Sequence, residues 1–435
     1  MPRFFIQNFG CRATQADGAA LGSMLAQRGL EEVRQSTSAD LVILNTCTVT
    51  AAADDDVRQT VRRLHRQNPD ANILVTGCYA QRAPEELAAL PGVRWVVGNS
   101  HKANIPVIAS DAHSRLDFHG EIHIGDIRNQ QEFLWAPVEA GGDLTRPNLK
   151  IQDGCDNRCS FCIIPSVRGR SRSASADEVV GQVRTLARQH QEVVLSGINL
   201  GRWGRDAGLP QQIRLAGLVR RLLEETSIQR LRLSSVEPMD FSDDLLQLMA
   251  DSPRIANHVH APLQSGCDTV LKRMKRRYRA RHYESRLRIA RKSMPEAAIG
   301  ADVMVGFPGE TDVEFEESRS FIEAMPFTYL HVFTYSERPG TPAAESASHV
   351  PIPVRKSRNR ILRELAAEKN LAFRRSFLGR SLSVVTLQDG RHAVSENYLK
   401  VELDAARPGN QIVNLAIGAL TADGLREKSC LPVLL

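Results

Sequence analysis

The sequence lacks long apolar runs and has few aromatic or cysteine residues. No stretch of its 435 residues approaches the roughly 18 consecutive apolar residues that a membrane-spanning helix needs. The opening residues, MPRFFIQNFGCRATQ, contain no secretory signal core, because polar residues follow almost at once. Eight cysteines are too few for a disulfide framework in a chain of this length. These absences predict a cytoplasmic protein with no membrane span.

The rest of the composition is that of a folded protein with unevenly spread charge. Hydrophobic residues make up 42% and charged residues 24%, which excludes wholesale disorder, and the length suggests two or three domains. The net charge is +6, yet residues 272–292 hold eleven Lys/Arg against one Glu, and residues 351–380 hold nine against two. Clustered basic side chains favour a polyanionic partner, because they release counterions from phosphates. The alternative is a pair of solvated helix faces.

Residues 1–110 predict a small α/β domain. Strand-like runs alternate with amphipathic stretches, and this alternation is typical of a parallel sheet. The predicted strands are RFFIQNFG, DLVILNTCTV and NILVTGC, with Cys11 after FFIQNFG, Cys47 after LVILNT and Cys78 after ILVTG. Because the carboxyl ends of parallel strands share one edge of the sheet, where ligands bind, we expect these three cysteines to converge.

The remainder of the chain predicts a linker and two further domains. Residues 111–145 have no clear periodicity and are interpreted as a linker. Residues 146–371 contain six β/α units, too few for a closed eight-unit barrel, and predict an open (β/α)6 partial barrel. Thr311 and Glu314 form a capping-box pattern at the start of one of its helices. Residues 372–435 are short β-rich segments separated by turns, which predict a small antiparallel β-barrel of the kind that often binds oligonucleotides.

A second group of cysteines has metal-ligand spacing. The segment GCDNRCSFC places Cys155, Cys159 and Cys162 on the loop after the first strand of the partial barrel. A soft thiolate set selects zinc or an iron–sulfur cluster, and zinc ribbons prefer paired C-x2-C units, which are absent here. A [4Fe–4S] cluster held by three cysteines keeps one iron open. Such an iron binds and reduces a small molecule.

At this point the sequence resembles a known family. The C-x3-C-x2-C spacing with Phe161 before the last cysteine, on a six-unit barrel, resembles the radical S-adenosylmethionine superfamily. The continuation CIIPSVRGRSRS, with GCRATQADG, NTCTVT and VTGCYAQR near the N-terminus, is similar to the methylthiotransferases. The likeness spans essentially the whole chain and includes a C-terminal domain of the TRAM type. The segments FTYSERPGTPAA and VSENYLKVEL resemble the branch that acts on threonylcarbamoyladenosine in tRNA.

The resemblance implies two [4Fe–4S] clusters and S-adenosylmethionine as cofactors. The cluster on Cys155, Cys159 and Cys162 would bind S-adenosylmethionine at its open iron and release a 5′-deoxyadenosyl radical on reduction. Cys11, Cys47 and Cys78 would hold the second cluster, where the sulfur to be transferred is bound. An aromatic C–H is too inert for acid–base chemistry, so a cofactor-derived radical must perform the hard step. No catalytic residue is implied beyond these ligands.

The resemblance and the position of strand ends also predict binding residues. The predicted cofactor contacts lie mainly at the barrel mouth: Phe161, Ser196, Gly197, Asn199, Glu237, Gln264, Asp302 and Gly306. The predicted RNA contacts are basic: Arg168, Arg170, Arg172, Lys275, Arg276, Arg374 and Arg375. Tyr398 and Phe377 are candidates for stacking on a base, or else core residues.

The function implied by the resemblance is conversion of N6-threonylcarbamoyladenosine next to the anticodon (position 37) to its 2-methylthio derivative. One S-adenosylmethionine would donate the methyl group and another the radical. The partners would be tRNA and an electron donor of flavodoxin or ferredoxin type, while the sulfur donor and the oligomeric state stay open. Isopentenyladenosine and a ribosomal-protein aspartate are alternative substrates. A non-enzymatic iron–sulfur RNA binder or redox sensor is the alternative class.

Overall fold

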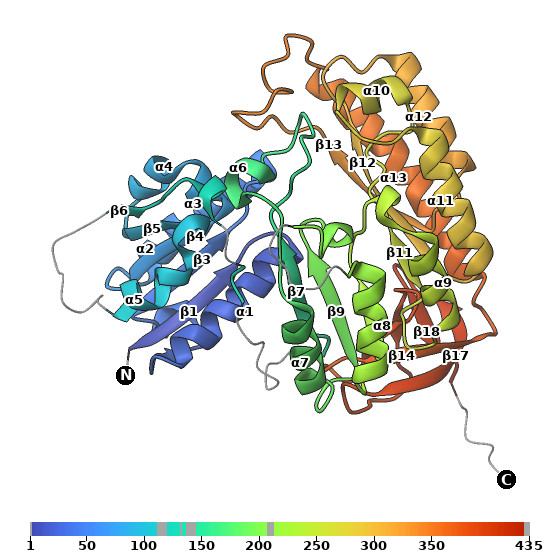
Figure 1. The fold of residues 1–435 in the computed structure, drawn as a ribbon, viewed down its shortest axis with the longest axis horizontal. Coiled ribbons are helices and arrows are strands. Elements are labelled where there is room, and N and C mark those ends of the chain that lie inside the picture. The colour runs from blue at the N-terminus through green and yellow to red at the C-terminus, as the bar shows by residue number, and fades with distance from the viewer. Residues whose placement is uncertain (1, 111–119, 131–132, 136–144, 207–212, 430–435) are drawn as a thin grey trace.

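The chain folds into three regions that follow one another in sequence and meet around a common centre (Figure 1). The computed structural model describes residues 2–110, 120–130, 133–135, 145–206 and 213–429. None of the helices in these ranges combines the length and apolarity that crossing a bilayer requires.

The N-terminal region is a parallel six-stranded sheet in the order β2-β1-β3-β4-β5-β6. Its strands are β1 (Arg3–Asn8), β2 (Glu31–Glu32), β3 (Leu41–Thr46), β4 (Asn72–Gly77), β5 (Val93–Gly98) and β6 (Glu121–His123). Its helices are α1 (Arg12–Ala26), α2 (Ala51–Gln67), α3 (Cys78–Arg82), α4 (Pro84–Ala88) and α5 (Ile105–Ser110). Residues of β3 alternate between the two faces: Val42 belongs to the core that includes Val61 of α2, and Ile43 to the core that includes Leu21 of α1. The sheet is therefore buried on both sides, as parallel sheets usually are.

The three strands predicted in this region are confirmed, and the structure adds strands that the sequence did not indicate. β6 lies inside the segment predicted as a linker and pairs with β5, where Trp95 is opposite Glu121. The short helix η4 (Ile127–Asn129) follows, with Ile127 buried. The rest of that segment lies largely outside the described residues.

The central region contains six parallel strands in chain order, as expected for an open (β/α)6 barrel. They are β7 (Asn148–Asp153), β9 (Glu192–Gly197), β10 (Arg230–Leu233), β11 (His258–His260), β12 (Ala298–Val305) and β13 (Tyr329–Thr334). β8 (Arg172–Ser173) pairs antiparallel with β7, and a single bridge from Leu231 to Ile255 connects β10 to the segment before β11.

Helices cover the outside of the partial barrel. They are α7 (Ala176–Leu186), α8 (Leu215–Glu225), α9 (Asp243–Asp251), α10 (Asp268–Arg273), α11 (Ala280–Ser293), α12 (Asp312–Ala324) and α13 (Ile352–Arg375). The short helix α6 (Ile164–Arg168) packs instead against α3 of the N-terminal region, where Val167 shares a cluster with Cys78. The capping box predicted at Thr311 and Glu314 is confirmed at the start of α12. One large hydrophobic core connects strands and helices of this region.

The C-terminal region is a closed five-stranded barrel in the order β14-β15-β16-β18-β17. Its strands are β14 (Ser381–Thr386), β15 (His392–Ser395), β16 (Lys400–Glu402), β17 (Ile412–Leu420) and β18 (Leu425–Glu427). The prediction of a small barrel is confirmed, with one correction: β16 and β18 pair in parallel, because β18 returns to close the barrel beside β16. The helix α13 crosses the predicted boundary at residue 372.

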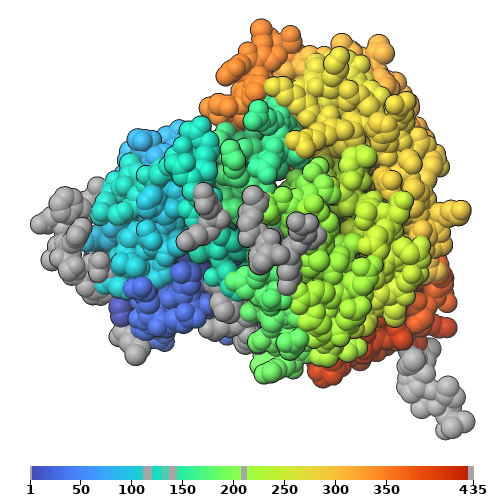
Figure 2. All heavy atoms as spheres, in the orientation of Figure 1, coloured from blue at the N-terminus to red at the C-terminus, as the bar shows by residue number. Residues whose placement is uncertain are grey.

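The three regions pack directly against one another. In the space-filling view the cyan atoms of the N-terminal region abut the green atoms of the first β/α units, and the red atoms of the C-terminal barrel lie below these (Figure 2). Asn148 at the start of β7 donates to the carbonyl oxygen of Arg12 in α1 at 2.7 Å. Arg232 of β10 donates to the carbonyl oxygens of Ser395 and Glu396, each at 3.0 Å. These contacts bring both terminal regions to the lumen of the partial barrel.

Candidate functional site

The first three cysteines meet at one edge of the N-terminal sheet. Cys11 follows β1, Cys47 follows β3 and Cys78 follows β4, and these three strands are neighbours in the sheet. Burial raises the pKa of the Cys47 thiol to about 12, and the nearby sulfurs of Cys78 and Cys11 add to the rise. Three thiolates this close repel one another, so a bound metal is needed to keep them deprotonated together.

Two glycines allow this convergence. Gly10 has φ +91°, and a Cβ there would lie 2.5 Å from the Cβ and 2.8 Å from the Sγ of Cys47. Gly77 has φ +101°, and a Cβ there would lie 2.4 Å from the carbonyl oxygen of Thr46. Only glycine fits these left-handed, crowded positions. The close approach of the three loops therefore requires glycine immediately before Cys11 and Cys78.

The second trio lies on the loop between β7 and α6. Two backbone hydrogen bonds hold this loop. The Cys155 amide donates to the carbonyl oxygen of Gly169, just past α6, at 3.0 Å, and the Cys162 amide donates to that of Cys159 at 3.1 Å. Burial raises the pKa of the Cys162 thiol to about 12, and the sulfurs of Cys159 and Cys155 contribute. As in the first trio, burial and the neighbouring sulfurs together favour the protonated thiol, so a bound metal is needed to keep the three sulfurs deprotonated.

The donor chemistry of each trio fits an iron–sulfur cluster. Each trio offers three cysteine sulfurs, a soft donor set that selects zinc or an iron–sulfur cluster. Structural zinc sites usually have four protein ligands, whereas a [4Fe–4S] cluster held by three cysteines keeps one iron open. A separate group, His260, Asp302 and His331, brings three ligand atoms within 4.8 Å of one another.

Each trio has a guanidinium group against one of its sulfurs. Arg168 donates from Nε to Cys78 Sγ at 3.2 Å, and Arg276 donates from Nη1 to Cys159 Sγ at 3.2 Å. Asn199 adds a weaker contact from Nδ2 to Cys155 Sγ at 3.6 Å. Hydrogen bonds to ligand sulfurs are a principal means by which a protein tunes a cluster.

One cavity of about 550 Å³ lies between the second trio and Cys11 of the first. Its lining includes Cys11 and Val49 from the N-terminal region, all three cysteines of the second trio, and Tyr398 from the C-terminal barrel. The volume is in the range of small-molecule sites. All three regions of the chain thus contribute to a single site.

Most of the predicted cofactor contacts line this cavity. They are Phe161, Ser196, Gly197, Asn199, Glu237, Gln264 and Asp302. Glu237 is ion-paired with Arg276, and burial raises the pKa of its carboxyl group even though Arg276 opposes the rise. Gly306 is not in the lining. Its amide donates to the Glu310 carboxylate at 2.6 Å, and a Cβ would lie 2.4 Å from Cγ of Arg355, so its place is explained by packing.

The structure buries four of the seven predicted RNA contacts. Arg168, Arg172, Arg276 and Arg374 are each less than a tenth exposed. Arg168 is ion-paired with Asp17 and Asp153, and Arg374 donates to carbonyl oxygens of the C-terminal barrel, including that of Gly424 at 3.1 Å. Their partners are protein groups, so we correct the assignment of these four to the fold. Arg170, Lys275 and Arg375 are exposed.

The two candidates for base stacking differ in position. Phe377 is 1% exposed in the core of the C-terminal barrel and contacts Phe373. Tyr398 lines the cavity, with its ring 4.9 Å from that of His258. Tyr398 is therefore available to a ligand in the cavity, and Phe377 is a core residue.

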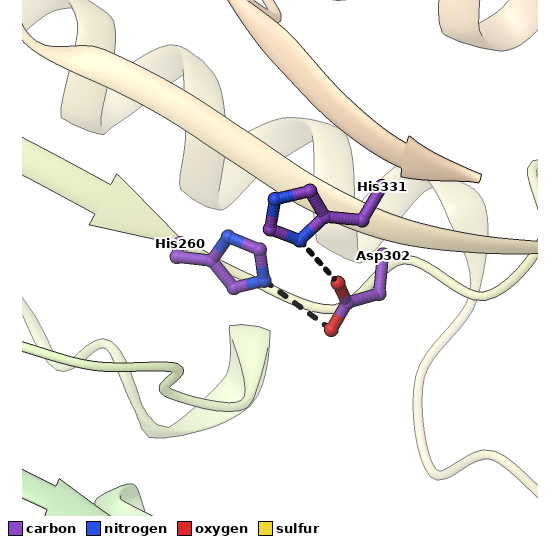
Figure 3. Close-up of side chains that lie close together, drawn as sticks. All are labelled: His260, Asp302 and His331. Carbon is purple, nitrogen blue, oxygen red and sulfur yellow. Dashed lines mark hydrogen bonds and ion pairs between the residues drawn. The ribbon is translucent and has the colours of Figure 1, made fainter. Parts of the chain in front are cut away.

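Sequence reasoning singled out Asp302 but missed four polar side chains near it on the last three barrel strands. His258 and His260 come from β11, Asp302 from β12, and Tyr329 and His331 from β13 (Figure 3 shows three of them). The Tyr329 hydroxyl contacts His258 Nε2 at 2.7 Å and His260 Nδ1 at 2.8 Å. Asp302 contacts His260 Nε2 at 3.2 Å and His331 Nδ1 at 3.1 Å. We call these five residues, together with Arg12 and Tyr398 at one end, the polar wall.

A glycine on the middle strand makes the polar wall possible. Gly300 of β12 lies in register between His260 and Tyr329, and a Cβ there would lie 1.9 Å from Cζ of the tyrosine. The Tyr329 ring therefore crosses β12 to reach the histidines. The signal in the sequence is the alternation in HVH and YLH, since alternate residues of a strand face the same side.

Comparison with known proteins gives consistent matches over nearly the whole chain. Residues 3–98 match the model of the Uncharacterized protein family UPF0004, and residues 149–322 match the Radical SAM superfamily. The Threonylcarbamoyladenosine tRNA methylthiotransferase MtaB of Aquifex aeolicus is 35% identical over 94% of this chain and 99% of its own. A tRNA-2-methylthio-N(6)-dimethylallyladenosine synthase of Novosphingobium aromaticivorans is 32% identical over 89% of this chain and 87% of its own.

A solved structure shares the fold. The radical S-adenosylmethionine methyltransferase TsrM from Kitasatospora setae, determined with tryptophan and an S-adenosylmethionine analogue, superposes with a TM-score of 0.59. The match covers 79% of this chain and 75% of that one at 16% identity. It supports the architecture described above.

Proposed function

Because this chain belongs to the radical S-adenosylmethionine methylthiotransferase family, we propose that it converts N6-threonylcarbamoyladenosine, next to the anticodon of tRNA, to the 2-methylthio derivative. The enzyme transfers a sulfur-containing group by radical chemistry. The observation that carries the proposal is one cavity lined by all three cysteines of the second trio and by Cys11 of the first. A non-enzymatic sensor would need one metal site and no cavity shared with a second.

The family uses S-adenosylmethionine and a [4Fe–4S] cluster, for which Cys155, Cys159 and Cys162 are the ligands we assign. We further propose that Cys11, Cys47 and Cys78 hold a second [4Fe–4S] cluster. Support comes from the all-thiol donor set, the mutual influence of the three sulfurs and the glycines that bring the loops together. When bound, these groups supply the radical and the sulfur that acid–base chemistry cannot provide.

The side chains around the cavity prepare the site for these groups. Asn199 and Arg276 donate to sulfurs of the second trio and so orient them. Arg276 also fixes Glu237, which lies in the cavity lining where a ribose or amino group of the cofactor can be bound. Val49 and Phe161 give the lining apolar surface, which limits water near a reactive radical.

The polynucleotide partner is tRNA. The exposed Arg170, Lys275 and Arg375 keep the predicted role of phosphate contacts. The C-terminal barrel supplies Tyr398 to the cavity, which we propose places this domain beside the target base. A flavodoxin or ferredoxin type of protein is the proposed electron donor.

Dimethylallyladenosine is the second candidate substrate, since a relative named for that nucleoside matches 89% of this chain. Mass spectrometry of tRNA nucleosides from cells with and without the gene separates the two. Loss of the methylthio-threonylcarbamoyl nucleoside supports the proposal. Loss of only the methylthio-dimethylallyl nucleoside refutes the choice of substrate and leaves the reaction class intact.

Anaerobic reconstitution with iron and sulfide tests the two clusters. The proposal expects about eight irons per chain, and about four after Cys11→Ala or Cys159→Ala. Uptake of about four irons by the unchanged protein would refute the second cluster.

A further inference from the structure

The end of the cavity at Tyr398 carries more positive than negative charge. Behind Tyr398, Glu192 is fully buried and pairs with Arg232 at 2.7 Å, Arg146 at 3.4 Å and Arg230 at 3.7 Å. Glu396, half-buried near Arg230, is a second carboxylate. With Arg12, this end of the cavity has four arginines against these two carboxylates. The local field therefore attracts an anionic group.

Arg12 is the arginine of this group that reaches the cavity. It is half-buried in the lining and donates from Nη2 to the Tyr398 hydroxyl at 3.1 Å. Among the described residues, no carboxylate is ion-paired with it, whereas Arg146, Arg230 and Arg232 all share Glu192. Arg12 therefore has hydrogen-bonding capacity to offer an incoming carboxylate.

Tyr398 is held firmly beside Arg12. Its backbone has φ +64°, an unfavourable value for a side chain of this size. The turn is kept by the Ser395 hydroxyl, which accepts from the Leu399 amide at 2.8 Å, and by Arg232, which donates to the carbonyl oxygens of Ser395 and Glu396. Such strain persists only where surrounding contacts impose it, and it is common at ligand sites.

The rest of the polar wall presents further donors and acceptors. Its histidines, Tyr329 and Asp302 form one chain of hydrogen bonds along the lining. His258 Nδ1 is buried without a hydrogen-bond partner within the described structure. A ligand group with donors and acceptors of its own can hydrogen-bond to this wall, whereas an apolar group cannot.

We propose that the polar wall binds the N6 substituent of the target adenosine, and that Arg12, with the Tyr398 hydroxyl, receives its carboxylate. This inference rests on the proposed function. A threonylcarbamoyl group carries a carboxylate, a hydroxyl and a urea-like amide, all of which match the wall. A dimethylallyl group carries none of them. Arg12 and Tyr398 thus determine which modified adenosine is accepted.

The test measures how strongly the substituent contributes to binding. The reconstituted holoenzyme is titrated with one tRNA in two forms, bearing threonylcarbamoyladenosine or unmodified adenosine at the target position. Wild type binds the threonylcarbamoyl form more tightly. Arg12→Gln reduces this preference by about ten- to a hundredfold, the usual effect of losing a charge-assisted hydrogen bond. Arg12→Lys keeps part of the preference, because it keeps the charge.

Two further variants separate the contact from indirect effects. Tyr398→Phe removes one hydroxyl far in sequence from any cluster ligand, and should lower the same preference about three- to tenfold. Arg28→Gln, an exposed arginine just past the other end of α1, is the matched control and keeps the full preference.

The outcomes distinguish the two proposals. If wild type thiomethylates only dimethylallyl-tRNA, the proposed function fails and this inference with it. If wild type converts threonylcarbamoyl-tRNA but Arg12→Gln and Tyr398→Phe keep its preference, or weaken both forms of the tRNA equally, only the inference is overturned.

Discussion

Arg168 donates a hydrogen bond from Nε to the Sγ of Cys78 at 3.2 Å, although 90 positions separate the two residues in the chain. The same guanidinium is ion-paired with Asp17 of the N-terminal region and Asp153 of the barrel. Lys102 and Lys150 complete this buried cluster of charges. The contact thus connects the first cysteine trio to the interface between two regions of the fold.

Replacing Arg168 should destabilise this interface. Arg168→Met leaves the buried carboxylates of Asp17 and Asp153 with less positive charge to balance them. Removing one partner of a buried ion pair typically lowers the free energy of unfolding by about 3–5 kcal/mol. We expect the midpoint of thermal unfolding to fall by roughly 5 °C or more. Arg170→Met, two residues along and exposed, is the control. Equal midpoints for the two variants would contradict the role of this cluster in stability.

The same cluster predicts how stability depends on pH. Burial by itself raises the pKa of Asp17, but the charges of Lys102, Lys150 and Arg168 outweigh it and hold this pKa well below its ordinary value. A depressed folded-state pKa contributes stability that is complete above the unfolded value of about 4 and is lost as the pH falls below it.

Asp17→Asn is the variant that tests this sign. It should be less stable than wild type at pH 7, and the difference should shrink as calorimetric scans are taken from pH 5 toward pH 3. The Arg3–Asp40 ion pair is exposed, so Asp40→Asn should change little across the range. A difference that grows on acidification would show that Asp17 is not stabilised as a charged group.

The sequence predicted the parts of the site that depend on periodicity and spacing. Cys11, Cys47 and Cys78 each follow a strand, and parallel strands end at a common edge, so their convergence followed from pattern alone. The C-x3-C-x2-C loop was visible from its cysteine spacing alone. Both signals are local, because each needs only a strand end or a short loop.

Features that depend on tertiary packing were not predictable in this way. Arg168 and Arg276 stand in basic runs, and only the folded chain shows that each is buried against a cysteine sulfur. Tyr398 belongs to a strand-like segment, yet a turn at positive φ splits that segment and places the ring in a cavity of another region. β6 was missed because three residues carry too little periodic signal.

Gly10→Ala should specifically remove the first cluster. An added methyl group meets the Cβ and Sγ of Cys47 at less than 3 Å, so the cysteine must shift. We expect reconstituted iron to fall by about four per chain, since one cluster is lost. Gly29→Ala is the matched control: it has a similar positive φ of +82°, but no atom lies within 4 Å of the added Cβ. Equal iron contents for the two variants would contradict this account of the first trio.

Arg276 should set the reduction potential of the cluster on the second trio. It places a positive charge 3.2 Å from Cys159 Sγ, and a nearby cation favours the reduced, more negative cluster. Arg276→Met removes that charge and leaves Glu237 without its partner, and both changes lower the potential. A shift of tens of millivolts is expected, because about 1.4 kcal/mol corresponds to roughly 59 mV for one electron.

The measurement is a redox titration followed by electron paramagnetic resonance. It is made in a variant with Cys11, Cys47 and Cys78 replaced by Ala, so that the signal comes only from the cluster on the second trio. Arg277→Met, the exposed neighbour, controls for a general loss of surface charge and should leave the potential within a few millivolts of the background value. If Arg276→Met raises the potential, or changes it no more than Arg277→Met, the guanidinium does not stabilise the reduced cluster, and its contact with Cys159 serves only to hold the loop.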